Sequence, residues 1–185
     1  MIARDKIALK EGPALRLAVV ADTHSCPHPG TLEQLRTLAP DAILHAGDIG
    51  DLGVLDDLKQ IAPLYAIRGN IDVHGDDVPD HRTIDLVAGD QTLLRIFLVH
   101  IAVAGPRLQG HVAKLAHKEA AKLVVCGHSH VPFVGEDRGL TIFNPGSCGP
   151  RRFTLPIVFG TIEITAGKLR FGHVEAATGK SWIPS

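Results

Sequence analysis

The sequence lacks several features that would point to particular classes of protein. No apolar run approaches the roughly 20 residues that a membrane-spanning helix needs, and the segment from Met1 to Pro13 lacks the apolar stretch of a signal peptide. The formal net charge of −1 offers no bulk positive charge for holding a nucleic acid. Only three cysteines occur, Cys26, Cys126 and Cys148, at no zinc-ribbon spacing. We therefore expect a reduced, cytoplasmic protein without a membrane partner.

The chain is long enough for one domain with a hydrophobic core, and it is rich in histidine. Its 185 residues are 45% hydrophobic and 21% charged, which is typical of a globular protein with one domain. Eleven histidines are present, many beside Gly or Asp, and this makes metal binding worth testing. We predict that residues 1–14 form a loosely held N-terminal extension and that residues 15–185 form a single domain.

Apolar periodicity in the first half predicts a βαβαβ order. Thr31 can cap a first helix, Pro40 ends it, and both predicted helices place Leu residues at helical spacing. Such an order implies parallel strands joined by right-handed crossovers. The predicted strands are residues 15–21, 42–45 and 64–67, and the predicted helices are residues 31–39 and 52–60.

The pattern changes in the second half. A β-hairpin is indicated around residues 88–91, and a helix and several short strands follow it. These strands are residues 82–87, 92–99, 122–126, 131–134, 140–143, 156–164 and 169–174, with the helix at residues 108–121. The fold class that we predict is α/β, as a two-sheet β-sandwich flanked by helices.

Polar side chains follow five apolar strands at the point where each strand ends. In open α/β sheets, sites form outside the carboxyl ends of such strands, so we expect these side chains to meet. One Asp-x-His pair or Gly-Asp turn is weak evidence alone, because such turns are common. The candidates are Asp22 and His24, Asp48, Asn70, His100, and His128 with His130.

These segments resemble the motifs of the calcineurin-like metallophosphoesterases. The matching segments are Asp-Thr-His at 22–24, Gly-Asp at 47–48, Gly-Asn at 69–70, His at 100 and Gly-His-Ser-His at 127–130. Arg-Gly-Asn-Ile-Asp at 68–72, Asn-Pro-Gly-Ser at 144–147 and Pro150-Arg151 are similar to the small single-domain phosphodiesterase branch. That branch also includes the Vps29-type retromer subunit.

The resemblance implies a binuclear centre in which Asp48 bridges two metal ions. Asp22, His24 and His130 would hold one ion, and Asn70, His100 and His128 would hold the other. This mixture of carboxylate, imidazole and amide ligands suits Mn, with Fe, Zn or Ni as alternatives, better than Mg. Asp48 and Asn70 would be catalytic. Arg151, and with it Arg152, could bind substrate phosphate, with simple solvation as the alternative; Arg151 is the candidate that we favour.

The implied activity is hydrolysis of small phosphodiesters by a metal-bridging hydroxide. The chain departs from the family where Ile71 follows Gly-Asn and where Ala102 follows His100-Ile101, because relatives often have an acid group at these places. Neither side chain can protonate a leaving group. The alternative is a non-catalytic metal-binding scaffold of the Vps29 type that works through protein contacts. The sequence leaves the oligomeric state open, a homo-oligomer included.

Several other histidines and cysteines can be explained by a structural or surface role as well as by a functional one. His45 lies inside an apolar strand. We expect it to support the structure or to contact a metal-binding side chain, and not to bind a metal itself. His173 is expected at the surface. Cys26 and Cys148 are expected on loops that border the site, either by chance placement or with a role in modulating the metals or in redox chemistry.

Overall fold

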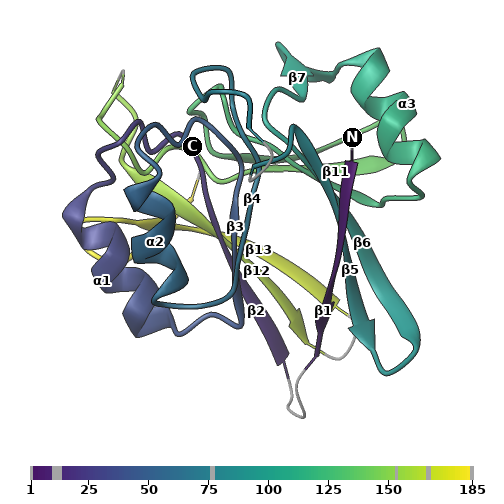
Figure 1. The fold of residues 1–185 in the computed structure, drawn as a ribbon, viewed down its shortest axis with the longest axis horizontal. Helices are drawn as coiled ribbons and strands as arrows, with labels where there is room; N and C mark the ends of the chain where they lie inside the picture. Colours follow the sequence, from purple (N-terminus) through teal and green to yellow (C-terminus); the bar gives the residue numbers. More distant parts are fainter. Residues whose placement is uncertain (1, 10–13, 76–77, 153, 166–167, 184–185) are drawn as a thin grey trace.

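The computed structural model describes residues 2–9, 14–75, 78–152, 154–165 and 168–183. Within them the chain forms two large sheets that face one another, with helices on the outer sides (Figure 1). None of the described helices is long and apolar enough to cross a membrane. The predicted α/β fold with two sheets and flanking helices is confirmed.

One sheet, here named the β2 sheet, has the strand order β14-β13-β12-β2-β3-β4. Strand β2 pairs in parallel with β3, and β3 pairs in parallel with β4, as the βαβαβ pattern predicts. Their carboxyl ends therefore meet at one edge. The bounds are Ala14–Val20 for β2, Ala42–His45 for β3, Leu64–Ala66 for β4, Val158–Thr165 for β12, Lys168–Glu175 for β13 and Ser181–Trp182 for β14.

The other sheet, here named the β5 sheet, has the order β1-β5-β6-β9-β11-β10. The predicted hairpin is present as β5 and β6, and β6 lies parallel to β9. The bounds are Ile2–Ala8 for β1, His81–Ala88 for β5, Gln91–Val99 for β6, Leu123–Val125 for β9, Phe133–Asp137 for β10 and Leu140–Asn144 for β11. A separate small hairpin joins β7 (Val103–Ala104) to β8 (Arg107–Leu108).

Alternation along the strands divides the apolar side chains into three layers. Leu17, Leu44, Ile84 and Ile96 belong to the cluster between the two sheets. Helices α1 (Pro29–Leu38) and α2 (Gly53–Lys59) pack on the outer face of the β2 sheet in a second cluster (Figure 1). Helix α3 (Gly110–Lys118) packs on the outer face of the β5 sheet in a third. This burial on both faces explains why the central strands are almost wholly apolar.

The expectation of a loosely held segment over residues 1–14 is wrong. Residues Ile2–Ala8 form β1, which pairs in parallel with β5 along its whole length, and Ile7 packs into the cluster between the sheets. The segment escaped the sequence analysis because charged side chains interrupt its apolar pattern. Arg4 forms an ion pair with Glu119, which lies just after α3, at 2.9 Å. Residues 10–13 lie outside the described part of the chain.

The start of α1 also differs from the prediction. The helix begins at Pro29, and the cap is His28, whose Nδ1 accepts a hydrogen bond from the backbone N–H of Gly30 at 3.1 Å. Thr31 is therefore buried within the first turn rather than capping it. Pro29 suits this position, because the first helical residues have no intrahelical partner for their N–H groups.

Candidate metal centre

The predicted ligands lie at the carboxyl ends of strands from both sheets. Asp22 and His24 follow β2, Asp48 follows β3 and Asn70 follows β4 in the β2 sheet. His100 follows β6, and His128 and His130 follow β9, in the β5 sheet. Because β2, β3 and β4 are parallel neighbours, and β6 and β9 are as well, both sheets direct their ligand loops to the same edge.

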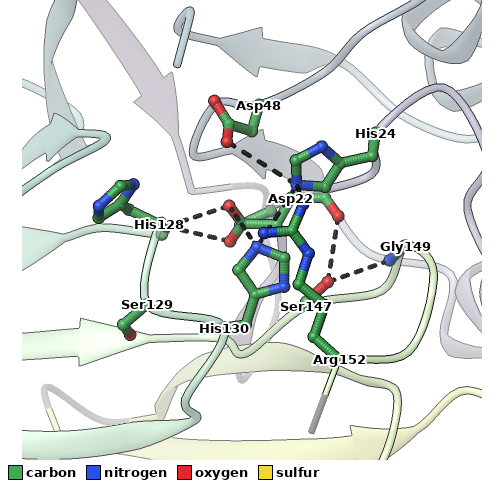
Figure 2. A network of polar contacts seen from close by, with 12 residues as sticks. Asp22, His24, Asp48, His128, Ser129, His130, Ser147, Gly149 and Arg152 are labelled. Atoms are coloured by element: carbon green, nitrogen blue, oxygen red, sulfur yellow. Dashed lines mark hydrogen bonds and ion pairs between the residues drawn. The ribbon is translucent and has the colours of Figure 1, made fainter. Parts of the chain in front are cut away.

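The first ligand group comprises Asp22, His24 and His130. The two imidazoles are stacked, with their Nε2 atoms 3.4 Å apart. His130 Nε2 is also 3.5 Å from the Oδ1 atom of Asp22. Figure 2 shows these three side chains converging from two different loops. Their ligand atoms all lie within 4.8 Å of one another, so one ion can contact all three.

The second ligand group comprises Asp48, His100 and His128. Asn70 belongs with it, because its Oδ1 atom is 3.1 Å from His100 Nε2 and 3.0 Å from His128 Nδ1. The Nδ1 atom of His100 lies 2.7 Å from the carbonyl oxygen of Ala46 and must donate to it. Nε2 is therefore the atom of His100 that faces the other ligands, as in metal sites where a second contact fixes the tautomer.

Asp48, a member of the second group, also approaches the first. Its Oδ1 atom is 3.1 Å from His100 Nε2, and its Oδ2 atom is 3.8 Å from His24 Nε2. The backbone N–H of Ile71 donates to Oδ1 at 3.2 Å, which fixes the carboxylate. With one oxygen toward each group, this carboxylate is placed to bridge two ions.

The backbone at the ligands is held in an unusual conformation. Five of the seven predicted ligands have positive φ angles, between 46° and 66°; they are Asp22, His24, Asp48, His128 and His130. A left-handed conformation costs on the order of 1–2 kcal/mol for such residues, and strain of this kind clusters at functional sites. Glycine allows the close approach of the loops. A Cβ atom on Gly69 would lie only 2.1 Å from Asp48 Oδ1.

The electrostatics of the site suit bound cations. Burial raises the pKa of Asp22 to about 7, although the charge of His100 opposes this. Burial would also raise the pKa of Asp48, but the hydrogen bond and charge of His100 outweigh it and hold that pKa at about 2. Burial lowers the pKa of His130 to about 4, so the ring is neutral and offers a lone pair. The residues present therefore fit two divalent ions, since each group gathers a carboxyl group with imidazole rings, the ligand types that such ions take.

Asp72 fixes the loops that carry the ligands, a role that no sequence pattern indicated. Its carboxylate accepts three backbone hydrogen bonds, from Ile49 at 3.0 Å, from Gly50 at 2.8 Å and from Gly69 at 2.7 Å. The loop after β3 is thereby tied to the loop after β4.

His45 has the structural role that was expected of it. The ring is fully buried, and burial lowers its pKa to about 4. Its Nδ1 accepts from the backbone N–H of Gly47 at 3.2 Å, and its Nε2 donates to Thr23 Oγ1 at 3.1 Å. Thr23 in turn donates to the carbonyl oxygen of Ile49 at 2.9 Å. This chain joins the loop after β2 to the loop after β3 behind the ligands.

An arginine also reaches the first ligand group. Arg152 Nη2 is 3.5 Å from His24 Nε2, and the guanidinium lies across the stacked imidazoles (Figure 2). After burial, its charge is the next cause of the lowered pKa of both His24 and His130. Arg151, the residue favoured by the sequence, is exposed. It lines a small cavity together with His130, but no hydrogen bond or ion pair joins it to a predicted ligand within the described residues.

The remaining expectations at the site have mixed outcomes. Ile71 is 46% exposed beside Asp48, whereas Ala102 is buried, so the two positions where relatives often have acid groups differ in their exposure to solvent.

Cys148 is fully buried with its pKa raised to about 12 by burial, which contradicts a reactive thiol at this position. Cys26 is exposed. His173 is buried and donates to the carbonyl oxygen of Asn144 at 2.8 Å, so its expected surface position is wrong.

Two facing sheets whose strand ends gather carboxylate, imidazole and amide ligands define a class of α/β metal-site proteins. The model of the calcineurin-like phosphoesterase superfamily domain matches residues 15–167, and the chain belongs to this superfamily. The resemblance noted from the motifs is thereby confirmed. The chain is also 30% identical over 160 residues to a probable metallophosphoesterase of Methanothermobacter thermautotrophicus, covering 83% of this chain and 88% of that protein.

Solved structures support the same fold. Vacuolar protein sorting 29 from Cryptosporidium parvum superposes with a TM-score of 0.73 at 18% identity, over 92% of this chain and 96% of that chain. Vps29 from Entamoeba histolytica, solved in complex with Zn²⁺, gives a TM-score of 0.69 at 20% identity, over 91% and 96% of the two chains. At these identities the likeness concerns the fold.

Proposed function

We propose that this protein is a binuclear-metal phosphoesterase that hydrolyses small phosphodiesters. The observation that carries the proposal is the position of Asp48, which directs one carboxylate oxygen to each of the two ligand groups. Membership of the calcineurin-like phosphoesterase superfamily supports the reaction class. Mn is the proposed metal, with Fe, Zn or Ni as alternatives, and the complex of the Entamoeba Vps29 with Zn²⁺ makes Zn worth testing.

Two bound divalent ions supply positive charge for the phosphate oxygens and lower the pKa of water towards ~7. The protein positions the reacting groups around them. Asp48 keeps the two ligand groups in register, and Asn70 Oδ1 faces the second group. Asn70 Nδ2 has no hydrogen-bond partner in the described part of the chain, so it is free to donate to a phosphate oxygen.

Arg152 is the proposed phosphate-binding cation, in place of Arg151. Its guanidinium lies within 3.5 Å of His24, so it can donate to an oxygen of a phosphate held beside the first ligand group. We expect Arg152→Gln to raise KM for a phosphodiester about tenfold or more, a loss of ~1.4 kcal/mol or more in binding. Arg151→Gln should leave KM within twofold, and steady-state kinetics of both variants measure the difference. Equal effects in the two variants would contradict the assignment.

The experiment that tests the proposed function combines metal analysis with a substrate screen. Purified protein is stripped of metal, reloaded with Mn²⁺, Zn²⁺ or Ni²⁺, and assayed for bound ions per chain. Each form is then tested on aryl and alkyl phosphodiesters and on phosphate monoesters. We expect two ions per chain and measurable cleavage of aryl phosphodiesters. Two bound ions with no hydrolysis of any ester would reject the enzyme and favour the second candidate.

That second candidate is a metal-binding scaffold of the Vps29 type. It is favoured by exposed apolar side chains on the two loops that Asp72 ties together: Leu52 is 56% exposed, Ile71 46% and Val73 90%. Isolated apolar residues are normal on a surface, but a group beside a site can mark a protein interface. A scaffold would bind a protein partner through this rim. For this protein, a cytoplasmic location and a homo-oligomeric state both remain predictions from the sequence.

A further inference from the structure

A cavity of about 370 Å³ adjoins the second ligand group. Asn70 and His100 form part of its wall, so a group in the cavity lies directly beside the predicted metal ligands. The rest of the wall comes from residues that no step of the proposed hydrolysis uses. They are Arg68, Gly69, Asp80, His81, Val99, Ile101 and His111.

Three polar side chains in this wall have unused hydrogen-bonding capacity. Asp80 accepts from Arg68 through Oδ1, while its Oδ2 accepts no hydrogen bond from any described residue. His81 stacks on Phe97, and no hydrogen bond to its ring nitrogens is formed by the part of the chain that the structure describes. The same is true of His111, which is exposed on the first turn of α3. Strand β5, the residue just before it and helix α3 thus bring donors and acceptors to one cavity, and the described part of the chain does not satisfy them.

The charges in the wall largely cancel. The Arg68 guanidinium is paired with the Asp80 carboxylate, and it also donates to the carbonyl oxygens of Gly69 and Asp72. Burial lowers the pKa of His81, which favours its neutral form. The wall contains no lysine and no arginine besides Arg68, so a second anionic group would find no unpaired guanidinium or ammonium here. Hydroxyl groups, in contrast, can donate to Asp80 Oδ2 and exchange hydrogen bonds with both imidazoles.

We propose that this cavity binds an uncharged, hydroxyl-bearing alcohol arm of the phosphoester, and that His111 is a specificity-determining residue. The inference rests on the proposed function, since the phosphate must lie at the metal centre for the arm to enter the cavity. A three-carbon polyol is small enough for the available volume. A larger cavity of about 560 Å³, between the β7–β8 hairpin and β10, includes none of the predicted ligands in its wall and has a mostly apolar lining.

The test measures binding to the Zn²⁺-loaded full chain by calorimetry, so it does not depend on turnover. The probes are inorganic phosphate, glycerol 3-phosphate and propyl phosphate, the last two of which differ only in the two hydroxyl groups. We expect the parent to bind glycerol 3-phosphate about tenfold more tightly than propyl phosphate. In His111→Leu this preference should fall to twofold or less, while the affinity for inorganic phosphate stays unchanged. His117→Leu, on the same helix but outside the cavity wall, should keep the full preference.

The outcomes separate the inference from the function on which it rests. Equal binding of the two esters by the parent, or an unchanged preference in His111→Leu, would overturn the inference while phosphate binding still supports the proposed function. Failure of inorganic phosphate and both esters to bind the Zn²⁺-loaded parent would overturn both. A loss of inorganic phosphate binding in His111→Leu would also overturn the inference, because it would assign His111 to the phosphate and not to the arm.

Discussion

Asp48 is the residue on which both ligand groups depend. Asp48→Asn removes the negative charge between them while keeping the size of the side chain. We expect occupancy by two ions to be lost and activity to fall ~10²-fold or more, since even residues that only support ligands are worth 10–100-fold. Metal analysis and phosphodiester kinetics measure these effects. Asp56→Asn, which changes an exposed carboxylate on α2, should alter neither. Full activity with two bound ions in Asp48→Asn would show that the bridge is misassigned.

Ile71 leads to a second prediction at this scale. Its side chain is exposed beside Asp48 and cannot protonate a leaving alkoxide, so the parent should cleave aryl phosphodiesters much faster than alkyl ones. Ile71→His should speed the alkyl substrates more than the aryl ones, by about 10²-fold, the lower end of the range typical of general acid catalysis. The measurement is kcat/KM for both classes. Ile71→Gln is the control, because it adds polarity without an acid. Equal alkyl and aryl rates in the parent would mean that another residue supplies the proton.

At single residues, the sequence was most informative where a side chain has one characteristic chemistry. The Asp and His candidates stood out because they follow apolar strands, and the structure brings all seven predicted ligands to one edge. The role of Asp72 could not be foreseen, and the sequence could not decide between Arg151 and Arg152. Asp72 acts only because two loops place three backbone N–H groups around it. The contact of Arg152 with His24 depends on the path of a loop more than 100 residues away in sequence.

Among the elements, β1 is the one whose contribution is easiest to test. Ile7 is 6% exposed and packs between the sheets, although it comes from an edge strand. Ile7→Ala should destabilise the fold by about 2 kcal/mol, the lower end of the range for such changes, and lower Tm by about 4–8 °C. Lys6→Ala on the exposed side of the same strand should shift Tm by less than 2 °C. A shift for Ile7→Ala as small as that for Lys6→Ala would mean that β1 is not firmly paired in solution.

Elements with a continuous apolar run were predicted well, and elements that depend on distant partners were not. The buried strands β2, β3 and β6 lie within one residue of their expected bounds. In β1 the side chains of Arg4 and Asp5 hide the strand pattern, and their partners Glu119 and Arg82 lie far along the chain. The short strands β7, β8 and β14 carry too few residues to show any periodicity.

Over the whole molecule, the buried histidine behind the site should make stability depend on pH. The pKa of His45 is about 4 in the fold against 6.5 for a free ring, so the unfolded chain binds more protons between these values. Stability should therefore fall as pH decreases from 6.5 to 4, by up to about 3 kcal/mol from this residue. Urea unfolding of metal-free protein at several pH values measures the slope. His45→Gln should be less stable at pH 7 but flatter with pH, and an equally steep slope in that variant would remove His45 as the cause.

The spread of the ligands along the chain also sets the order of events during synthesis. His24 and His130, whose rings stack in the first ligand group, are 106 residues apart. Strand β2 emerges from the ribosome early, yet Asp22 has no imidazole partner from β9 until most of the chain has been translated. A nascent chain therefore presents only scattered, weak ligands to the cellular metal pool. Metal selection falls to the finished fold, whose fixed geometry decides which ion is kept.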